Sequence, residues 1–158
     1  MSHSYQKILF SGFVQKFNKH GKSSQRAILI TDQFVSKLEP KRFKPMEVYS
    51  MTQVRGISIS SRDDTLAVIH LNNDNDLVFF IRSLAIENRL GELIGVLLVH
   101  WQRAYGKELP ITIGENLSCM LGAKHQQLSV ILNPSQAGVP PVFKKSGAHI
   151  QLLWPVPA

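Results

Sequence analysis

The chain has 158 residues, of which 44% are hydrophobic and 18% charged, and its formal net charge is +7. This length fits one domain, and the apolar content excludes a generally disordered chain because it is sufficient to build a core. No apolar run reaches the roughly 20 residues that a membrane-spanning helix needs, the first residues do not form a signal-peptide pattern, and the single cysteine, Cys119, excludes an intrachain disulfide.

The positive charge is concentrated in the first part of the chain. Residues 1–62 contain eleven Lys and Arg against three Asp and Glu, whereas residues 63–158 contain seven against eight. Such an uneven distribution predicts an anionic partner, and nucleic acid, anionic lipid and an acidic protein all fit. A solvated basic surface without a partner is the alternative.

In chain order, alternating or apolar stretches bounded by turn residues predict a series of short strands. These strands lie at residues 5–17, 26–31, 34–38, 47–60, 65–71 and 77–82. We expect a break near Gly56 in the fourth of them. Polar residues predict loops at 18–25 and 39–46, and a turn at 72–76 joins the last two strands into a hairpin.

After this hairpin apolar residues no longer recur at every second position but at spacings of three and four residues. The new period predicts an amphipathic helix over about 84–104. Its apolar stripe consists of Ile86, Leu90, Leu93, Ile94, Leu97, Leu98 and Trp101. Three further strands are predicted at 109–120, 126–132 and 148–154, with a long loop at 133–147.

This order of elements predicts a mainly β fold of the α+β type. Successive hairpins favour an antiparallel barrel or sandwich, and a helix of this length can cover one open end of a barrel. The arrangement is that of a pleckstrin-homology-like barrel. We therefore expect one domain over residues 1–158, with a barrel core at 5–104 and a C-terminal β extension at 105–158.

Sequence motifs for catalysis are absent. Gly21-Lys22-Ser23 matches the end of a phosphate-binding P-loop, but Lys16 stands where the motif needs its first glycine and a strand follows instead of a helix. No Gly-x-Ser-x-Gly elbow occurs. We expect a chain that is not an enzyme and uses no cofactor.

Metal-binding motifs are absent as well. Asn72, Asp74 and Asp76 have the spacing of a calcium loop, but Leu77 replaces its required glycine, so a solvated turn is the better interpretation. The six histidines have no metal-ligand spacing. His70, in a predicted strand, is expected to be a structural histidine with hydrogen-bond partners.

Basic residues surround the loop between the first two predicted strands. Lys16 closes the first strand, Lys19 and Lys22 lie in the loop, and Arg26 opens the second strand. Strand alternation places Lys16 and Arg26 on the apolar faces of their strands. If those faces line a barrel, both charges emerge at its open mouth and can hold a multiply charged phosphate headgroup. Exposed loop charges without a ligand are the alternative.

Three segments resemble the tail homology 1 domain of class I myosins. They are VQKFNKHGKSSQRAILITDQFVSKL (14–38), MTQVRGISISSRDDTLAVIHL (51–71) and ENRLGELIGVLLVHW (87–101). The ending PPVFKKSGAHIQLLWPVPA is similar to the C-terminus of the short-tailed, D/G-like subclass. The resemblance covers most of the chain. It implies a pleckstrin-homology-like fold and a membrane-anchoring tail that links an actin motor to membranes.

The resemblance also implies a lipid headgroup site. The family motif has a lysine at the end of the first strand, followed by basic-x-Arg at the start of the second. Lys16 and Arg26 match its outer positions, whereas Ser24 stands at the middle basic position, so the preferred phosphoinositide stays open. Lys19 and Lys22 add charge to this site.

The basic loop at 39–46 is expected to face the membrane as an auxiliary site. Its cations are Lys41, Arg42 and Lys44. The expected partners are anionic phospholipids, phosphatidylinositol bisphosphate, the motor and calmodulin-bound neck of a whole myosin, and a protein cargo. The expected location is cytoplasmic, at the cell cortex and on the inner face of the plasma membrane or endosomes. A protein-interaction module is the alternative function, and a nucleic-acid-binding domain is the less favoured one.

Overall fold

The computed structural model describes residues 7–18, 22–60, 66–72, 75–81, 89–114, 116–122, 124–133, 142–146 and 149–155. Seven strands precede the helix in this part of the chain: β1 (Ile8–Phe17), β2 (Ser23–Thr31), β3 (Phe34–Leu38), β4 (Pro45–Ser50), β5 (Val54–Ser60), β6 (Leu66–Leu71) and β7 (Leu77–Phe80). After α1 (Arg89–Tyr105) come β8 (Ile111–Gly114), β9 (Asn116–Leu121), β10 (Lys124–Asn133), β11 (Val142–Ser146) and β12 (His149–Pro155).

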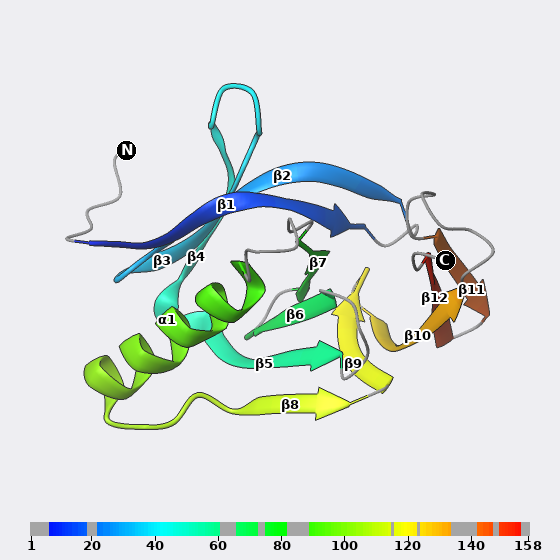
Figure 1. The fold of residues 1–158 in the computed structure, drawn as a ribbon. Helices are drawn as coiled ribbons and strands as arrows, with labels where there is room; N and C mark the ends of the chain where they lie inside the picture. Colours follow the sequence, from blue (N-terminus) through cyan, green and yellow to red (C-terminus); the bar gives the residue numbers. More distant parts are fainter. Residues whose placement is uncertain are drawn as a thin grey trace.

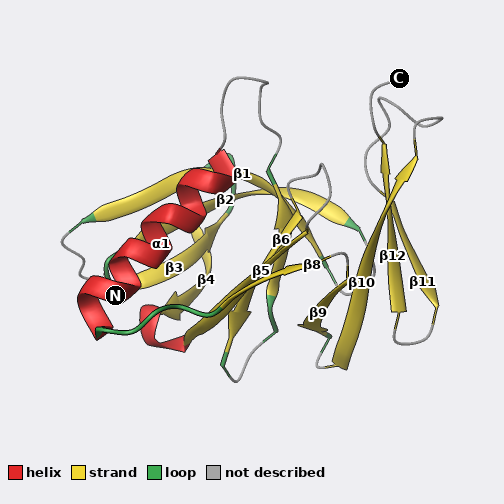
Figure 2. Ribbon diagram, turned by 60° about the horizontal axis from the view of Figure 1, so that its bottom comes forward, coloured by secondary structure: helices red, strands yellow, loops and turns green. Residues whose placement is uncertain are grey.

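The strands form two sheets, as Figure 1 shows. The larger sheet has eight strands in the order β4-β3-β2-β1-β7-β6-β5-β8, and all its neighbours are antiparallel except β5 and β8. The smaller sheet has four strands in the order β11-β12-β10-β9. In Figure 2, α1 lies along the curved large sheet, and the small sheet stands at the opposite side of the molecule.

Two groups of buried apolar side chains hold these layers together. The inner cluster lies between the curved sheet and α1, which contributes the fully buried Leu93 and Leu97. The outer cluster joins the large sheet to the small one, with Phe17 and Phe80 packed beside Leu117 and other residues of β9 and β10. All four residues of β7 are buried, because their side chains alternate between the two clusters.

The structure corrects the prediction for residues 39–60 at two places. The predicted loop ends too late, because β4 begins at Pro45. This strand is at the edge of its sheet, where proline is tolerated since no ladder needs its missing N–H. The break between strands lies at Met51–Gln53 and not at Gly56. There the Ser50 side chain accepts a hydrogen bond from the Thr52 N–H, and Gln53 Oε1 accepts one from the Ser50 N–H (3.0 Å), which together cap a short 3-10 turn.

After residue 82 the structure and the sequence-based prediction are compared at three places. The helix is described at Arg89–Tyr105, and residues 84–88 of its predicted range lie outside the described residues. The predicted strand at 109–120 is two strands, of which β8 joins the large sheet and β9 the small one. The predicted loop at 133–147 contains β11. In the described part of the chain, no helix has both the length and the apolar character needed to cross a membrane.

Candidate functional site

The ends of β1 and β2 place two of the predicted basic residues on the inner face of the large sheet. Val14 lies opposite Arg26, and Lys16 lies opposite Ser24. Residues opposite one another in an antiparallel pair project to the same face, and Val14 is buried in the inner cluster. Lys16 and Arg26 therefore project toward the interior at one end of the sheet, where both are half-buried. Within the described residues neither of them forms an ion pair.

A third cation, Lys37 of β3, shares this face. Lys37 lies opposite Ile28, a member of the inner cluster, and opposite Glu47 of β4. Lys37 is only 8% exposed, and its Nζ donates a hydrogen bond to Glu47 Oε1. The Tyr49 hydroxyl donates to the other carboxylate oxygen. Three cations and one carboxylate therefore meet at the mouth of the barrel, and we call Lys16, Arg26, Lys37 and Glu47 the mouth cluster.

The electrostatics of the mouth cluster favour an added anion. The pKa of Lys16 is lowered to about 8, first by burial and then by the charge of Lys37, while Glu47 opposes the shift and Arg26 adds to it. Burial alone would raise the pKa of Glu47, but hydrogen bonds from Lys37 and Tyr49 outweigh it and hold that pKa below its ordinary value. A phosphate placed here would stabilise the protonated form of Lys16 and relieve the repulsion among the cations.

The other predicted basic residues are placed differently. Lys22 is exposed at the end of the β1–β2 loop, where its N–H donates to Asn18 Oδ1 (3.1 Å). Lys19 lies outside the described residues. The three cations of the auxiliary site are exposed in the β3–β4 loop, residues 39–44, which stands away from the body as the cyan loop in Figure 1. These cations are Lys41, Arg42 and Lys44. The predicted basic residues therefore divide between the mouth and a separate projecting loop.

Lys37 and Glu47 are absent from the sequence-based prediction of the site. All five residues of β3 are buried, so its sequence does not alternate between apolar and polar side chains and does not reveal which way Lys37 points. Val35, two residues before Lys37, is buried in the inner cluster, but Phe34 and Ser36 are buried as well, so the sequence carried no signal for the direction of Lys37. Lys37 supplies a third cation next to Lys16, whose cross-strand neighbour is the uncharged Ser24.

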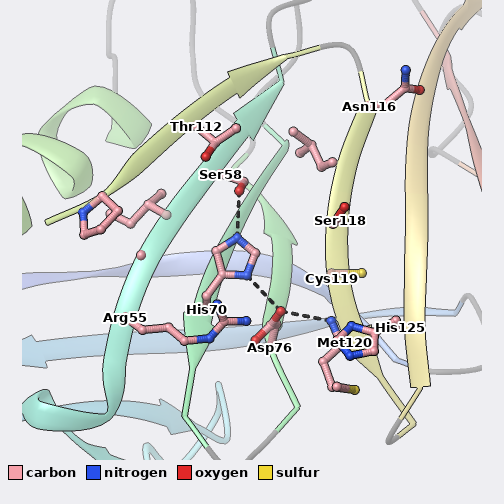
Figure 3. Close-up of a pocket in the computed structure, with 14 residues that line it drawn as sticks. Arg55, Ser58, His70, Asp76, Thr112, Asn116, Ser118, Cys119, Met120 and His125 are labelled. Carbon is pink, nitrogen blue, oxygen red and sulfur yellow. Dashed lines mark hydrogen bonds and ion pairs between the residues drawn. The ribbon is translucent and has the colours of Figure 1, made fainter.

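A second polar cluster lies where the two sheets meet, beside a cavity of about 410 Å³ (Figure 3). Ser58 Oγ is 2.6 Å from His70 Nε2, and His70 Nδ1 is 2.9 Å from Asp76 Oδ2. The Asp76 carboxylate also accepts hydrogen bonds from the N–H groups of Leu71 (3.0 Å) and Met120 (2.9 Å). The prediction that His70 is a structural histidine with hydrogen-bond partners is confirmed.

The interpretation of residues 72–76 as a solvated turn is wrong for Asp76, which is 2% exposed. Burial would raise the pKa of Asp76, but hydrogen bonds from His70, Leu71 and Met120 outweigh it and keep the pKa below its ordinary value. The backbone N–H of Asp76 also donates to the Met120 carbonyl (2.8 Å). Asp76 therefore ties the β6–β7 hairpin to β9.

The hydrogen-bonded chain Ser58–His70–Asp76 contains the same residue types as the catalytic triad of a hydrolase, but the surroundings of the serine differ. A catalytic serine needs unpaired N–H groups beside it to stabilise an oxyanion. Ser58 lies within β5, whose backbone is paired with β6 on one side and β8 on the other. We therefore assign this cluster to the joint between the sheets. Among the described residues, no group of three or more His, Cys, Asp or Glu side chains is placed to hold a metal ion.

Comparison with known proteins gives the family. The family model for the unconventional myosin tail, described as actin- and lipid-binding, matches residues 1–151. Unconventional myosin-Ig of Mus musculus is 34% identical over 151 residues, which is 94% of this chain and 14% of that protein. Unconventional myosin-Id of Danio rerio is 32% identical over 154 residues, which is 96% of this chain and 15% of that protein. The chain spans 14–15% of the length of these relatives.

Solved structures confirm the predicted pleckstrin-homology-like fold. The N-terminal PH domain of human ARAP2 has a TM-score of 0.50 and 14% identity, and the match covers 68% of this chain and 90% of that one. The hSac2 domain of a human phosphoinositide phosphatase has a TM-score of 0.50 and 11% identity, with 72% and 79% covered. The expectation of a binding domain, distinct from the catalytic motor head, is confirmed as well. The chain belongs to the family of unconventional myosin tails, which bind actin and lipid.

Proposed function

We propose that the mouth cluster binds the phosphorylated headgroup of a phosphoinositide and thereby holds an actin motor on an anionic membrane. The observation that carries this proposal is the half-buried Lys16, whose pKa is depressed to about 8 beside two further cations. Arg26 offers a fork of donors to phosphate, whereas Lys16 and Lys37 act as point charges. Lys19 and Lys22, from the β1–β2 loop, add to the positive field at the mouth.

The cellular setting follows from the same proposal. In a whole myosin a motor and a calmodulin-bound neck would precede this tail, and we propose that the tail lies on the inner face of the plasma membrane or of endosomes. Each cation near an anionic leaflet contributes about 1 kcal/mol. Three or four engaged cations therefore give roughly 3–4 kcal/mol. Such attachment is weak for one tail, so a specific headgroup contact or clustered tails are needed for stable binding.

Single substitutions in the mouth cluster and in the projecting loop test this function. Binding is measured by sedimentation with phosphatidylserine vesicles, with and without phosphatidylinositol bisphosphate. Lys16→Ala and Arg26→Ala should each weaken the bisphosphate-dependent part of the binding about tenfold or more, as expected for a lost charge-assisted contact. Lys41→Ala and Lys44→Ala are controls of equal charge that should weaken binding less and in a more salt-sensitive way. Equal losses in both sets would leave only a diffuse basic surface and refute a headgroup site.

A further inference from the structure

Two exposed aromatic side chains meet beside the projecting loop. Phe43 of the β3–β4 loop is 55% exposed, and Phe13 of β1 is 52% exposed. Their ring centroids are 6.2 Å apart. Met46, at the start of β4, is 46% exposed. Large apolar side chains so close together on the surface indicate a contact site.

The backbone of the loop is built to present Phe43. Phe43 has φ of 56°, the one positive φ of a non-glycine residue in the described part of the chain. A bulky residue adopts this conformation only where its surroundings impose it, and such strain concentrates at functional sites. Here the Glu39 carboxylate accepts hydrogen bonds from the N–H groups of Lys41 and Arg42, both at 2.8 Å. The Phe43 N–H donates to the Glu39 carbonyl, also at 2.8 Å.

The chemistry around Phe43 fits an anionic lipid surface. Three exposed cations flank the ring in the sequence: Lys41, Arg42 and Lys44. Cations attract an anionic leaflet, and an aromatic ring gains free energy by entering the boundary between headgroups and acyl chains. The loop stands out from the body of the molecule in Figure 1, which suits insertion between lipids. Phe13 and Phe43 also line a cavity of about 630 Å³, and capture of a peptide there is the alternative that vesicle binding tests.

We propose that Phe43, supported by Phe13, is an anchor that inserts into the leaflet to which the mouth cluster binds. Lys37 and Glu47 of the mouth cluster lie on β3 and β4, the two strands that the projecting loop joins, so one membrane surface can meet both sites. This inference rests on the proposed lipid-binding function. It adds an apolar contact to the charge interactions of the mouth.

The test compares Phe43→Gly with Ile113→Gly on phosphatidylcholine vesicles that contain phosphatidylserine and phosphatidylinositol bisphosphate. Ile113 of β8 is 62% exposed, and its strand lies on the side of the molecule away from the projecting loop in Figure 1. Phe43→Gly should weaken vesicle binding roughly tenfold, as expected for the loss of a buried Phe side chain. Its melting temperature should not fall, because glycine adopts positive φ without strain. Ile113→Gly should bind vesicles like the wild type.

A soluble headgroup separates this inference from the proposed function. Phe43→Gly should bind soluble inositol trisphosphate as the wild type does, whereas Lys16→Ala should not. If Phe43→Gly binds vesicles as tightly as the wild type while Lys16→Ala fails, the anchor is refuted and the headgroup site stands. If the wild type binds neither vesicles nor the soluble headgroup, both proposals fail.

A probe on residue 43 measures insertion directly. The only cysteine, Cys119, is buried, and burial raises the pKa of its thiol to about 12, so it resists labelling. A fluorophore on Phe43→Cys should shift to shorter wavelength on anionic vesicles and be quenched by spin-labelled acyl chains. The same fluorophore on Ile113→Cys should stay in water. Equal behaviour of the two labelled positions would refute insertion.

Discussion

Lys16 loses its proton more readily in the folded state than in the unfolded chain, because its folded pKa is about 8 and its ordinary value is 10.5. Between these values the unfolded chain binds more protons than the folded one. The contribution of Lys16 to the free energy of unfolding therefore rises as the pH increases from about 8 to 10.5. Below about pH 8 the folded protein holds a partly buried ammonium group, which an anionic ligand would stabilise.

The proposed headgroup site predicts a pH dependence of binding that follows Lys16. Affinity for phosphatidylinositol bisphosphate vesicles should fall as the pH rises from 7 to 9, because the ammonium group is lost near pH 8. Lys16→Arg keeps its charge over this range and should lose that decline, while the ionisation of the lipid affects both proteins alike. Sedimentation at constant ionic strength measures the difference. Parallel curves for the two proteins would remove Lys16 from the site.

In the proposed headgroup site Glu47 would compete with a bound phosphate for Lys37, and this predicts an unusual gain of affinity. Glu47→Gln removes the negative charge but leaves a carbonyl that accepts a hydrogen bond from Lys37. Affinity for the bisphosphate lipid should rise several-fold. Melting temperature without ligand should fall, because Lys37 is 8% exposed and would lose its ionic partner.

The control for this prediction is Glu108→Gln, at an exposed position after α1. This substitution changes the net charge equally but leaves the mouth cluster and the projecting loop intact. An equal gain of affinity for both variants would show that only net charge matters.

Whether the direction of a side chain could be predicted depends on whether apolar and polar residues alternate along its strand. Lys16 and Arg26 sit on strands whose inner residues are apolar, so strand alternation correctly oriented both. Lys37 could not be oriented, because β3 is buried on both faces. Asp76 could not be predicted as buried, because its partner Met120 is 44 residues away in the sequence.

Among the elements, too, those with a regular local pattern could be predicted from the sequence, and the helix is the clearest case. Its apolar period predicted α1 and its packing face, and Leu93 and Leu97 are fully buried as that period requires. Strand breaks were harder to predict. The break at Met51–Gln53 depends on a capping box, and the division of β8 from β9 depends on two different partner strands. Local composition does not encode such partners.

The packing of α1 predicts unequal costs for two neighbouring truncations. Leu97→Ala should lower the free energy of unfolding by about 2–5 kcal/mol, because it leaves a cavity in the inner cluster. Val99→Ala should change it by less than about 0.5 kcal/mol, because Val99 is 51% exposed. Urea denaturation of both variants measures the costs. Similar values for the two would mean that α1 does not close the core.

At the scale of the whole molecule, the boundary expected at residue 104 is not a boundary of the large sheet. β8 lies beyond that residue and pairs with β5, and the outer cluster includes Leu117, Leu121 and Leu128 of the small sheet. We propose that the C-terminal extension folds as part of the same cooperative unit as the barrel. A barrel cut at residue 104 would expose the apolar outer side of β6 and β7 to water.

Asp76 offers the sharpest test of whether the two sheets fold as one cooperative unit, because it accepts hydrogen bonds from both of them. Asp76→Asn replaces one acceptor by a donor, so a buried N–H or ring nitrogen loses its partner. Stability at pH 7 should fall by about 1.5–3 kcal/mol, the range for a hydrogen bond to a charged group. Glu108→Gln, at an exposed position, should cost less than about 0.5 kcal/mol.

The pH dependence of this loss follows from the pKa of Asp76. Because its folded pKa lies below its ordinary value of 3.8, Asp76 stabilises the fold fully above that value and loses its contribution as the pH falls below it. The stability difference between wild type and Asp76→Asn should therefore shrink as the pH falls from 5 toward 3. Hydrogen exchange should also show weaker protection of the Met120 N–H in the variant, since that group donates to Asp76. Unchanged Met120 protection would mean that the two sheets hold together without Asp76.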